Sequence, residues 1–160
     1  ITTTKELVQI IEKSKKRNLA KKINICTKTF QAFRIFVNQE ISELIKGIIE
    51  ATKALKPGGV LVTVSFHSIE DKIIKFYFKN YSSNKSKGSR YLPETNKEDL
   101  SLFENYRNKV ITASEKEIKS NLPSRSAKLR FATRNRNKIV NFFEFNQKFE
   151  NYLKIESLHA

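Results

Sequence analysis

Three side chains that could take part in chemistry lie within four residues, at the end of an apolar run. The segment VSFHSIEDK, residues 64–72, contains Ser65, His67 and Ser68 and continues into charged residues. Together with Asp71, a serine and the histidine could in principle form a nucleophilic triad. However, the spacing is not the G-x-S-x-G nucleophile elbow, and neighbours at a strand end point to different faces. A structural role for His67 is therefore favoured over hydrolysis.

The rest of the sequence gives no support to a metal or nucleotide site. The only other histidine is His159, Cys26 is the only cysteine, and no set of His, Cys and carboxylate residues has ligand spacing. None of the four glycines lies in a G-x-G-x-x-G or G-x-x-x-x-G-K-[ST] arrangement. We expect no metal and no intrachain disulfide, and any cofactor must be bound mainly by residues outside this chain.

The elements that position VSFHSIEDK follow from the apolar pattern. Helical spacing predicts helices over residues 3–14, 27–56 and 69–80, and a β-branched strand over residues 60–66 follows a KPGG turn. The strand is apolar on both faces, which is typical of a central parallel strand. Ser68 is expected to cap the next helix, with Asp71 as the capping-box partner. This order indicates a doubly wound α/β sheet, whose ligands lie beyond the carboxyl ends of its strands.

The second half of the chain is less regular. Residues 13–22 are predicted to form a basic connector and residues 82–99 a polar loop. A short strand within residues 106–114 is followed by a helical turn over residues 115–120, and could pair antiparallel with a strand over residues 126–133. In that last strand Lys128 and Arg130 are expected on one face and Leu129 and Phe131 on the other. The tail from residue 135 is expected to be a helix that packs on the outside.

The charge of the chain indicates a polyanionic partner. Lysine and arginine total 31 against 16 acidic residues, a formal charge of +15 over 160 residues. Such a charge favours nucleic acid, although a lysine- and asparagine-rich composition can also come from nucleotide bias. The sequence has no run of 18 apolar residues and no signal-peptide pattern, so we expect no membrane segment and a cytoplasmic location.

A polar stripe runs along the long helix predicted over residues 27–56. Thr27, Gln31, Arg34 and Asn38 share one face because steps of four, three and four residues return to nearly the same direction. Planar amide and guanidinium groups beside a core can line a cleft and contact phosphates or bases. The alternative is that they hold neighbouring loops in place.

Three ordered blocks carry a resemblance to a known family. The segments TKTFQAFRIFVNQEISEL, LKPGGVLVTVSFHSIEDKIIKFYF and SRSAKLRFA begin at residues 27, 55 and 124. They resemble the T-R-T-F-Q-A-L-R-I-x-V-N-x-E-L, L-x-P-G-G-x-L-x-V-I-S-F-H-S-L-E-D-R and R-S-A-K-L-R blocks of the ribosomal RNA small subunit methyltransferase H family. Lys28 and Lys72 replace arginines, so a planar phosphate clamp is not expected at those two positions.

The resemblance implies a fold, an activity and a cofactor. The family has a class I, Rossmann-like methyltransferase fold and uses S-adenosyl-L-methionine to methylate the N4 atom of a cytidine in small-subunit ribosomal RNA. Its donor loop and catalytic loop precede the part that this chain resembles. The chain is therefore expected to be a C-terminal portion, inactive alone, with the end of a helical insertion in residues 1–26, methyltransferase sheet in residues 27–134 and a tail in residues 135–160. The alternative is a non-catalytic module that binds RNA or the ribosome.

The resemblance also suggests which residues contact RNA. Arg34 and Lys72 are expected to contact phosphate, and Asn38, Ser65 and His67 to position the base. The remaining candidates match the same motif blocks: Thr29, Gln31, Ser68, Arg125, Lys128 and Arg130. A solvated strand face would explain Lys128 and Arg130 equally well. No residue of this chain is assigned a catalytic role, and the expected partner is small-subunit ribosomal RNA or the 30S subunit.

Overall fold

The computed structural model describes residues 1–14, 24–83 and 101–158. Most of the predicted basic connector and polar loop, and His159, lie outside the described residues. The chain forms two compact units, residues 1–42 with 151–160 and residues 43–150. The boundary falls inside a helix after Ser42.

The first unit is helical. It contains α1 (Thr4–Ser14), α2 (Thr27–Val37), the start of α3 (Glu40–Ala54) and most of α7 (Glu150–Ser157). The predicted helix over residues 3–14 is confirmed, and its first turn is capped because the Thr3 hydroxyl oxygen accepts a hydrogen bond from the Glu6 amide at 3.3 Å.

The single helix predicted over residues 27–56 is wrong, because the chain breaks between α2 and α3. Asn38 ends α2, and Gln39 adopts a left-handed conformation with φ of 51°. The break resets the helical phase, so the predicted apolar stripe does not continue through α2. Phe33 and Val37 are 49% and 56% exposed, and Ile35 is the buried residue of α2.

The second unit combines a small sheet with helices. After the rest of α3 come the elements β1 (Val60–Ser65), α4 (Ser68–Asn80), β2 (Phe103–Glu104), β3 (Ile111–Thr112), α5 (Glu115–Ser120), a 3₁₀ turn (Leu122–Ser126), β4 (Lys128–Arg134) and α6 (Phe143–Lys148). The predicted strands, the helix after β1 and the helical turn of α5 are all confirmed. The fold is mixed α/β, as the sequence indicates.

The sheet itself is antiparallel, which corrects the predicted parallel pairing of β1. The strand order is β1-β4-β2, with β3 also paired to β4, and each of these pairings is antiparallel. Val62 lies opposite Phe131 in the β1–β4 register. The predicted antiparallel pairing of the two later strands is confirmed by β3 and β4. The sequence indicated a central strand, but within the described residues β1 has a strand neighbour on one side only, which is β4.

The KPGG turn joins α3 to β1 as predicted. Gly58 has φ of 84°, a left-handed conformation that a residue with a side chain adopts only under strain. Its amide donates to the Arg134 carbonyl oxygen at 2.8 Å, and the Arg134 amide donates to the Gly59 carbonyl oxygen at 2.8 Å. The turn is therefore pinned to the end of β4.

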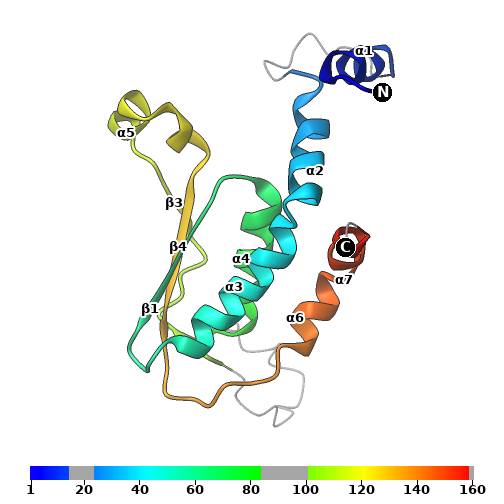
Figure 1. Ribbon diagram of the computed structural model, residues 1–160. Helices are drawn as coiled ribbons and strands as arrows, with labels where there is room; N and C mark the ends of the chain where they lie inside the picture. Colours follow the sequence, from blue (N-terminus) through cyan, green and yellow to red (C-terminus); the bar gives the residue numbers. More distant parts are fainter. Residues whose placement is uncertain (15–23, 84–100, 159–160) are drawn as a thin grey trace, which may run out of the picture. The chain divides into compact units, whose positions relative to one another are not determined.

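The core of this unit lies on the helix side of the sheet. Figure 1 shows α4 and most of α3 beside the sheet, and the Tyr77 hydroxyl donates to Thr52 Oγ1 at 2.7 Å between these two helices. A cluster of buried aromatic rings surrounds Tyr77: Phe78, Tyr81, Phe103, Phe142 and Phe145. The tail was predicted to be a helix on the outside, but its helix α6 contributes the fully buried Phe145 to this core.

Replacing Phe145 by alanine should strongly destabilise the chain. The ring is fully buried and lies 4.9 Å from the Tyr77 ring, so its loss leaves a cavity that costs about 3–5 kcal/mol of unfolding free energy. The matched control is Phe143→Ala in the same helix, since Phe143 is 64% exposed, and its cost should be below about 1 kcal/mol. Urea unfolding measures both values. Equal effects of the two variants would contradict this packing.

Candidate functional site

The corner after β1 holds the histidine and both serines of VSFHSIEDK. Ser65 is 2% exposed, and its hydroxyl donates to the Lys128 carbonyl oxygen across the β1–β4 pair at 3.5 Å. Ser68 begins α4 and is exposed. The structure therefore places the two serines in different environments, with Ser65 tied to the neighbouring strand and Ser68 open to solvent.

His67, not Ser68, caps helix α4. The backbone of His67 is extended, with φ of −133° and ψ of 164°, and its Nδ1 accepts a hydrogen bond from the Glu70 amide at 3.3 Å. The Glu70 carboxylate in turn accepts from the amides of Phe66 at 2.9 Å and His67 at 3.3 Å. The predicted box of Ser68 with Asp71 is thus wrong by one residue. Glutamate at the third helical position has the reach that aspartate lacks, and this signal was present in the sequence as Glu70.

Asp71 instead holds the basic residues of β4. Its carboxylate accepts from Lys128 Nζ at 3.0 Å and from Arg130 Nε at 2.9 Å. Burial opposes ionisation of Asp71, but the hydrogen bonds and charges of Arg130 and Lys128 outweigh it and lower the pKa of this carboxyl group below its ordinary value. Asp71 is therefore a charged anchor between α4 and β4.

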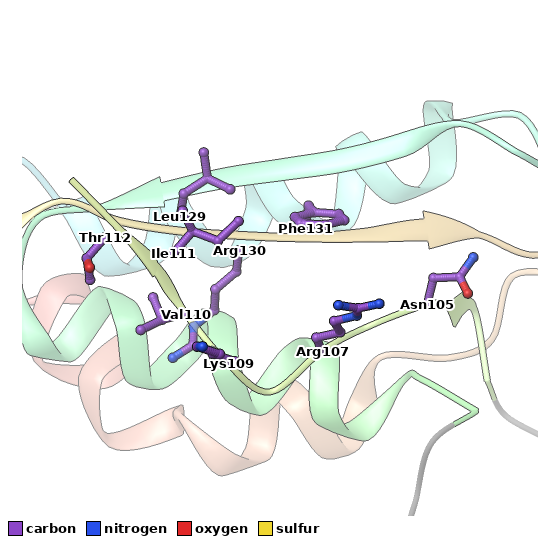
Figure 2. A pocket seen from close by; sticks show the side chains of 9 residues that line it. All are labelled: Asn105, Arg107, Lys109, Val110, Ile111, Thr112, Leu129, Arg130 and Phe131. Atoms are coloured by element: carbon purple, nitrogen blue, oxygen red, sulfur yellow. The ribbon is translucent and has the colours of Figure 1, made fainter. Parts of the chain in front are cut away.

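Arg130 lies on the buried face of β4, which corrects the expectation of a solvated basic face. The residue is 6% exposed, and its Nη1 also donates to the Asn108 carbonyl oxygen at 3.1 Å. The predicted alternation is present, and Figure 2 shows Leu129 and Arg130 pointing to opposite sides of the strand. The polar side faces α4 because Asp71 supplies a counter-charge there, while Phe131, two residues after Leu129, is exposed. Lys128 is half-buried beside the same carboxylate.

The remaining candidates of this unit are exposed. Lys72 lies on α4 one residue after Asp71, and Arg125 lies in the 3₁₀ turn before β4. Exposed lysine and arginine side chains of this kind can contact phosphate, with Lys72 acting as a point charge.

A second candidate cluster lies in the other unit, at the corner between α2 and α3. Arg34 forms a two-pronged ion pair with Glu40, with Nε to Oε1 at 2.7 Å and Nη2 to Oε2 at 3.0 Å. Asn38 Nδ2 donates to the same carboxylate at 3.3 Å. The structure thus brings Arg34 and Asn38 together around Glu40, which was not predicted from the sequence although it belongs to the same motif block. Thr29 and Gln31 lie half-buried on α2.

A pocket that the sequence did not indicate lies along the outer edge of β4. Residues 105–110 bow away from β4 between β2 and β3 and leave a volume of about 680 Å³. Figure 2 shows its lining residues, which are Asn105, Arg107, Lys109, Val110, Ile111, Thr112, Leu129, Arg130 and Phe131. Three of the nine carry positive charge and none carries negative charge, so this edge also favours an anion.

The second unit has an α/β arrangement, in which α3, the KPGG turn, β1 and the capped helix α4 follow one another. Its polar corner comes directly after the carboxyl end of β1, and α/β folds bind their ligands at the carboxyl ends of their strands. Comparison with known proteins identifies the family of this chain. The chain belongs to the MraW methylase family, whose model matches residues 1–135. The resemblance found in the three motif blocks is confirmed.

Its relatives carry a more specific name. The chain is 44% identical over 132 residues to a protein of Agrobacterium fabrum called ribosomal RNA small subunit methyltransferase H. Proteins with the same name from Rhizobium johnstonii and Hyphomonas neptunium are 45% and 40% identical over the same length. Each match covers 82% of this chain, and the chain spans 38% to 39% of the length of these relatives. The tail after residue 135 lies outside the family match.

Replacing Asp71 by asparagine should destabilise the chain in a pH-dependent way. At pH 7 the change leaves the buried Arg130 guanidinium without its carboxylate and should cost about 3 kcal/mol. Because the folded-state pKa of Asp71 is lowered, its contribution is fully present above about pH 4 and is lost as pH falls through the folded pKa. The difference between wild type and Asp71→Asn should therefore shrink in acid.

Urea unfolding at pH 7 and at several lower pH values measures this effect. The matched control is Glu50→Gln, which removes the exposed Lys53–Glu50 pair and should cost less than about 0.5 kcal/mol at any pH. An Asp71→Asn variant as stable as this control at pH 7 would show that the buried pair does not anchor α4 to β4.

Proposed function

We propose that this chain is a C-terminal portion of an S-adenosyl-L-methionine-dependent enzyme that methylates N4 of a cytidine in small-subunit ribosomal RNA. The observation that carries the proposal is the family match over residues 1–135, together with relatives named as methyltransferases of that RNA. The charge of +15 supports an RNA partner. Among the described helices none is long and apolar enough to cross a membrane, and we propose that the enzyme works in the cytoplasm.

The methyl donor would be held mainly by other parts of the enzyme. Bound S-adenosyl-L-methionine supplies a sulfonium methyl group that a nucleophile can attack. The described residues do not fit a donor-binding loop, because Gly58 and Gly59 are used in the turn that pins α3 and β1 to Arg134. We therefore assign no donor contact to this chain and expect no methyl transfer by it alone.

A sheet face that the described residues leave uncovered supports the proposal that this chain completes a larger domain. Val60, Val62 and Val64 of β1 are 50% to 54% exposed, and Phe131 beside Val62 is 38% exposed. Apolar side chains on both faces of a strand are typical of sheets with helices on both sides. The relatives have more than half of their length outside the matched part, which is enough to provide that second layer.

What this portion contributes is RNA binding and base positioning. The amino group of cytosine is a weak nucleophile because its lone pair is delocalised into the ring, and base pairing hides it. An enzyme must hold the unpaired base in line with the methyl group and exclude water. The exposed groups Arg34 and Lys72 are suited to phosphate contact, and Asn38 to base contact.

Two of the expected base contacts have a structural alternative. Ser65 is buried against the Lys128 carbonyl oxygen, so its hydroxyl serves the strand pairing. The His67 ring caps α4 through Nδ1, and its Nε2 lies 3.3 Å from Glu70 Oε1. We propose that His67 acts on RNA indirectly, by fixing the direction of α4 and thus of Lys72.

Methylation by the complete protein tests the proposed function. Incubation of the complete protein with S-adenosyl-L-methionine and unmodified 30S subunits should produce N4-methylated cytidine, detected by nuclease digestion and mass spectrometry. This chain alone should give none. Failure of the complete protein to methylate, or tight donor binding by this chain in calorimetry, would contradict the proposal.

Lys72→Ala tests the phosphate contact when the affinity of the complete protein for 30S subunits is measured in equilibrium binding titrations at several salt concentrations. The variant should weaken RNA binding about threefold to tenfold and reduce the slope of log affinity against log salt by about one, because one phosphate contact is lost. Lys79→Ala is the matched control, since this exposed lysine lies at the other end of α4, and its affinity should be unchanged. Equal salt slopes for wild type and Lys72→Ala would remove Lys72 from the RNA interface.

A further inference from the structure

A carboxylate of the tail completes the corner between α2 and α3. Glu156 of α7 is 3% exposed, and its two oxygens accept hydrogen bonds from the amides of Ile41 at 3.0 Å and Ser42 at 2.7 Å. The Ser42 hydroxyl also donates to Glu156. More than 110 residues of chain separate these partners, so this is a tertiary contact and not a local cap.

The position of Glu156 is favourable for a negative charge. Ile41 and Ser42 lie in the first turn of α3, a helix of 15 residues, where backbone amides have no partner within the helix. A carboxylate there accepts charge-assisted hydrogen bonds and interacts favourably with the helix dipole. Gln39, just before the helix, is in the left-handed conformation, so the chain enters α3 through a sharp bend. Glu156 therefore binds the backbone that directly follows this bend.

The same helical turn carries the ion pair of the candidate RNA-binding corner. Glu40 is the residue before Ile41, and its carboxylate receives Arg34 Nε and Nη2 and Asn38 Nδ2. A shift of the first turn of α3 would move Glu40 and with it the guanidinium of Arg34. Glu156 is thus bonded to the backbone that fixes the direction of Arg34.

We propose that Glu156 is a positioning residue, which orients Arg34 for RNA through the first turn of α3. The inference rests on the proposed function, and it gives a role to the tail, which lies outside the family match. The tail provides a contact to a motif block inside the matched region, so the RNA-binding corner of this protein is completed by a segment that the family model does not include.

Kinetics of the complete protein on 30S subunits test the proposal. Glu156→Ala should raise KM for the subunits about fivefold to tenfold with kcat within about twofold, because a phosphate contact holds ground state and transition state alike. Arg34→Ala should raise KM similarly. In the Arg34→Ala background, adding Glu156→Ala should change KM by less than about twofold, since both changes remove the same interaction.

Two further variants keep the test decisive. Glu156→Gln retains the size of the side chain and one carbonyl acceptor, and it replaces Glu156→Ala in the test if that variant does not fold. Its KM should lie between the wild-type KM and the fivefold to tenfold higher KM expected on loss of the carboxylate. Glu43→Ala removes an exposed carboxylate from the first turns of α3 and should leave KM unchanged. Additive effects of Arg34→Ala and the Glu156 variant, or lower stability with unchanged KM, would overturn the proposal and leave Glu156 with a stabilising role only.

A readout independent of methylation separates this proposal from the proposed function. The Arg34 Nε–H signal in NMR spectra of the complete protein, assigned with Arg34→Lys, should be protected from exchange by Glu40 in wild type and in Glu43→Ala. It should lose protection in the Glu156 variants. Unchanged protection would contradict the positioning role even if the protein methylates RNA, whereas lost protection would support it even if methylation fails.

Discussion

The antiparallel pair of β1 and β4 has one face that α3 and α4 cover and one apolar face that the described residues leave open, and the other features depend on this constraint. On the covered face, α3 and α4 bury the aromatic cluster around Tyr77, and Asp71 fixes Arg130. On the other face, Val60, Val62 and Val64 remain about half exposed. Water contact with so much apolar surface is unfavourable, at roughly 25 cal/mol per Å² of apolar area, so this face favours a further layer. The family match over two fifths of its relatives' length agrees with that need.

Charge pairing then determines which basic side chains are buried and which stay exposed. Buried charges are tolerated when they are paired, and Arg130 satisfies this rule through Asp71. The residues left toward solvent are Lys72 on α4 and, in the other unit, Arg34 in its ion pair with Glu40. The basic motif residues thus divide into two that Asp71 holds, Lys128 and Arg130, and others whose exposure fits the proposed phosphate contacts.

The sequence predicted where helices and strands lie better than it predicted which of their faces are buried and which residues they contact. Spacing and turn residues were sufficient for α1, β1, α4 and β4, because these elements follow strong local signals such as KPGG. The break at Gln39 was missed because neither glycine nor proline marks it, and the first turn of α3 is held by Glu156 from the tail. No local pattern predicts a partner so distant in the chain.

The candidate site was predicted in part for the same reason. The motif blocks indicated Arg34, Asn38 and His67, but the charged partners Glu40 and Glu70 were not singled out. The faces of β4 were assigned the wrong environments, because the burial of Arg130 depends on Asp71 of another element. Periodicity reports which residues share a face, whereas only tertiary contacts decide which face is buried.

The central claim is that this chain completes a larger α/β domain, and in such a domain β1 would be an internal strand with a second strand neighbour beside it. Hydrogen exchange of the complete protein, followed by NMR at the six amides of Val60–Ser65, tests it directly. If a further strand pairs with β1, the amides that point away from β4 should be protected as strongly as those that point toward it. If every second amide of β1 exchanges at the rate of an unprotected chain, β1 is an edge strand and the account is wrong.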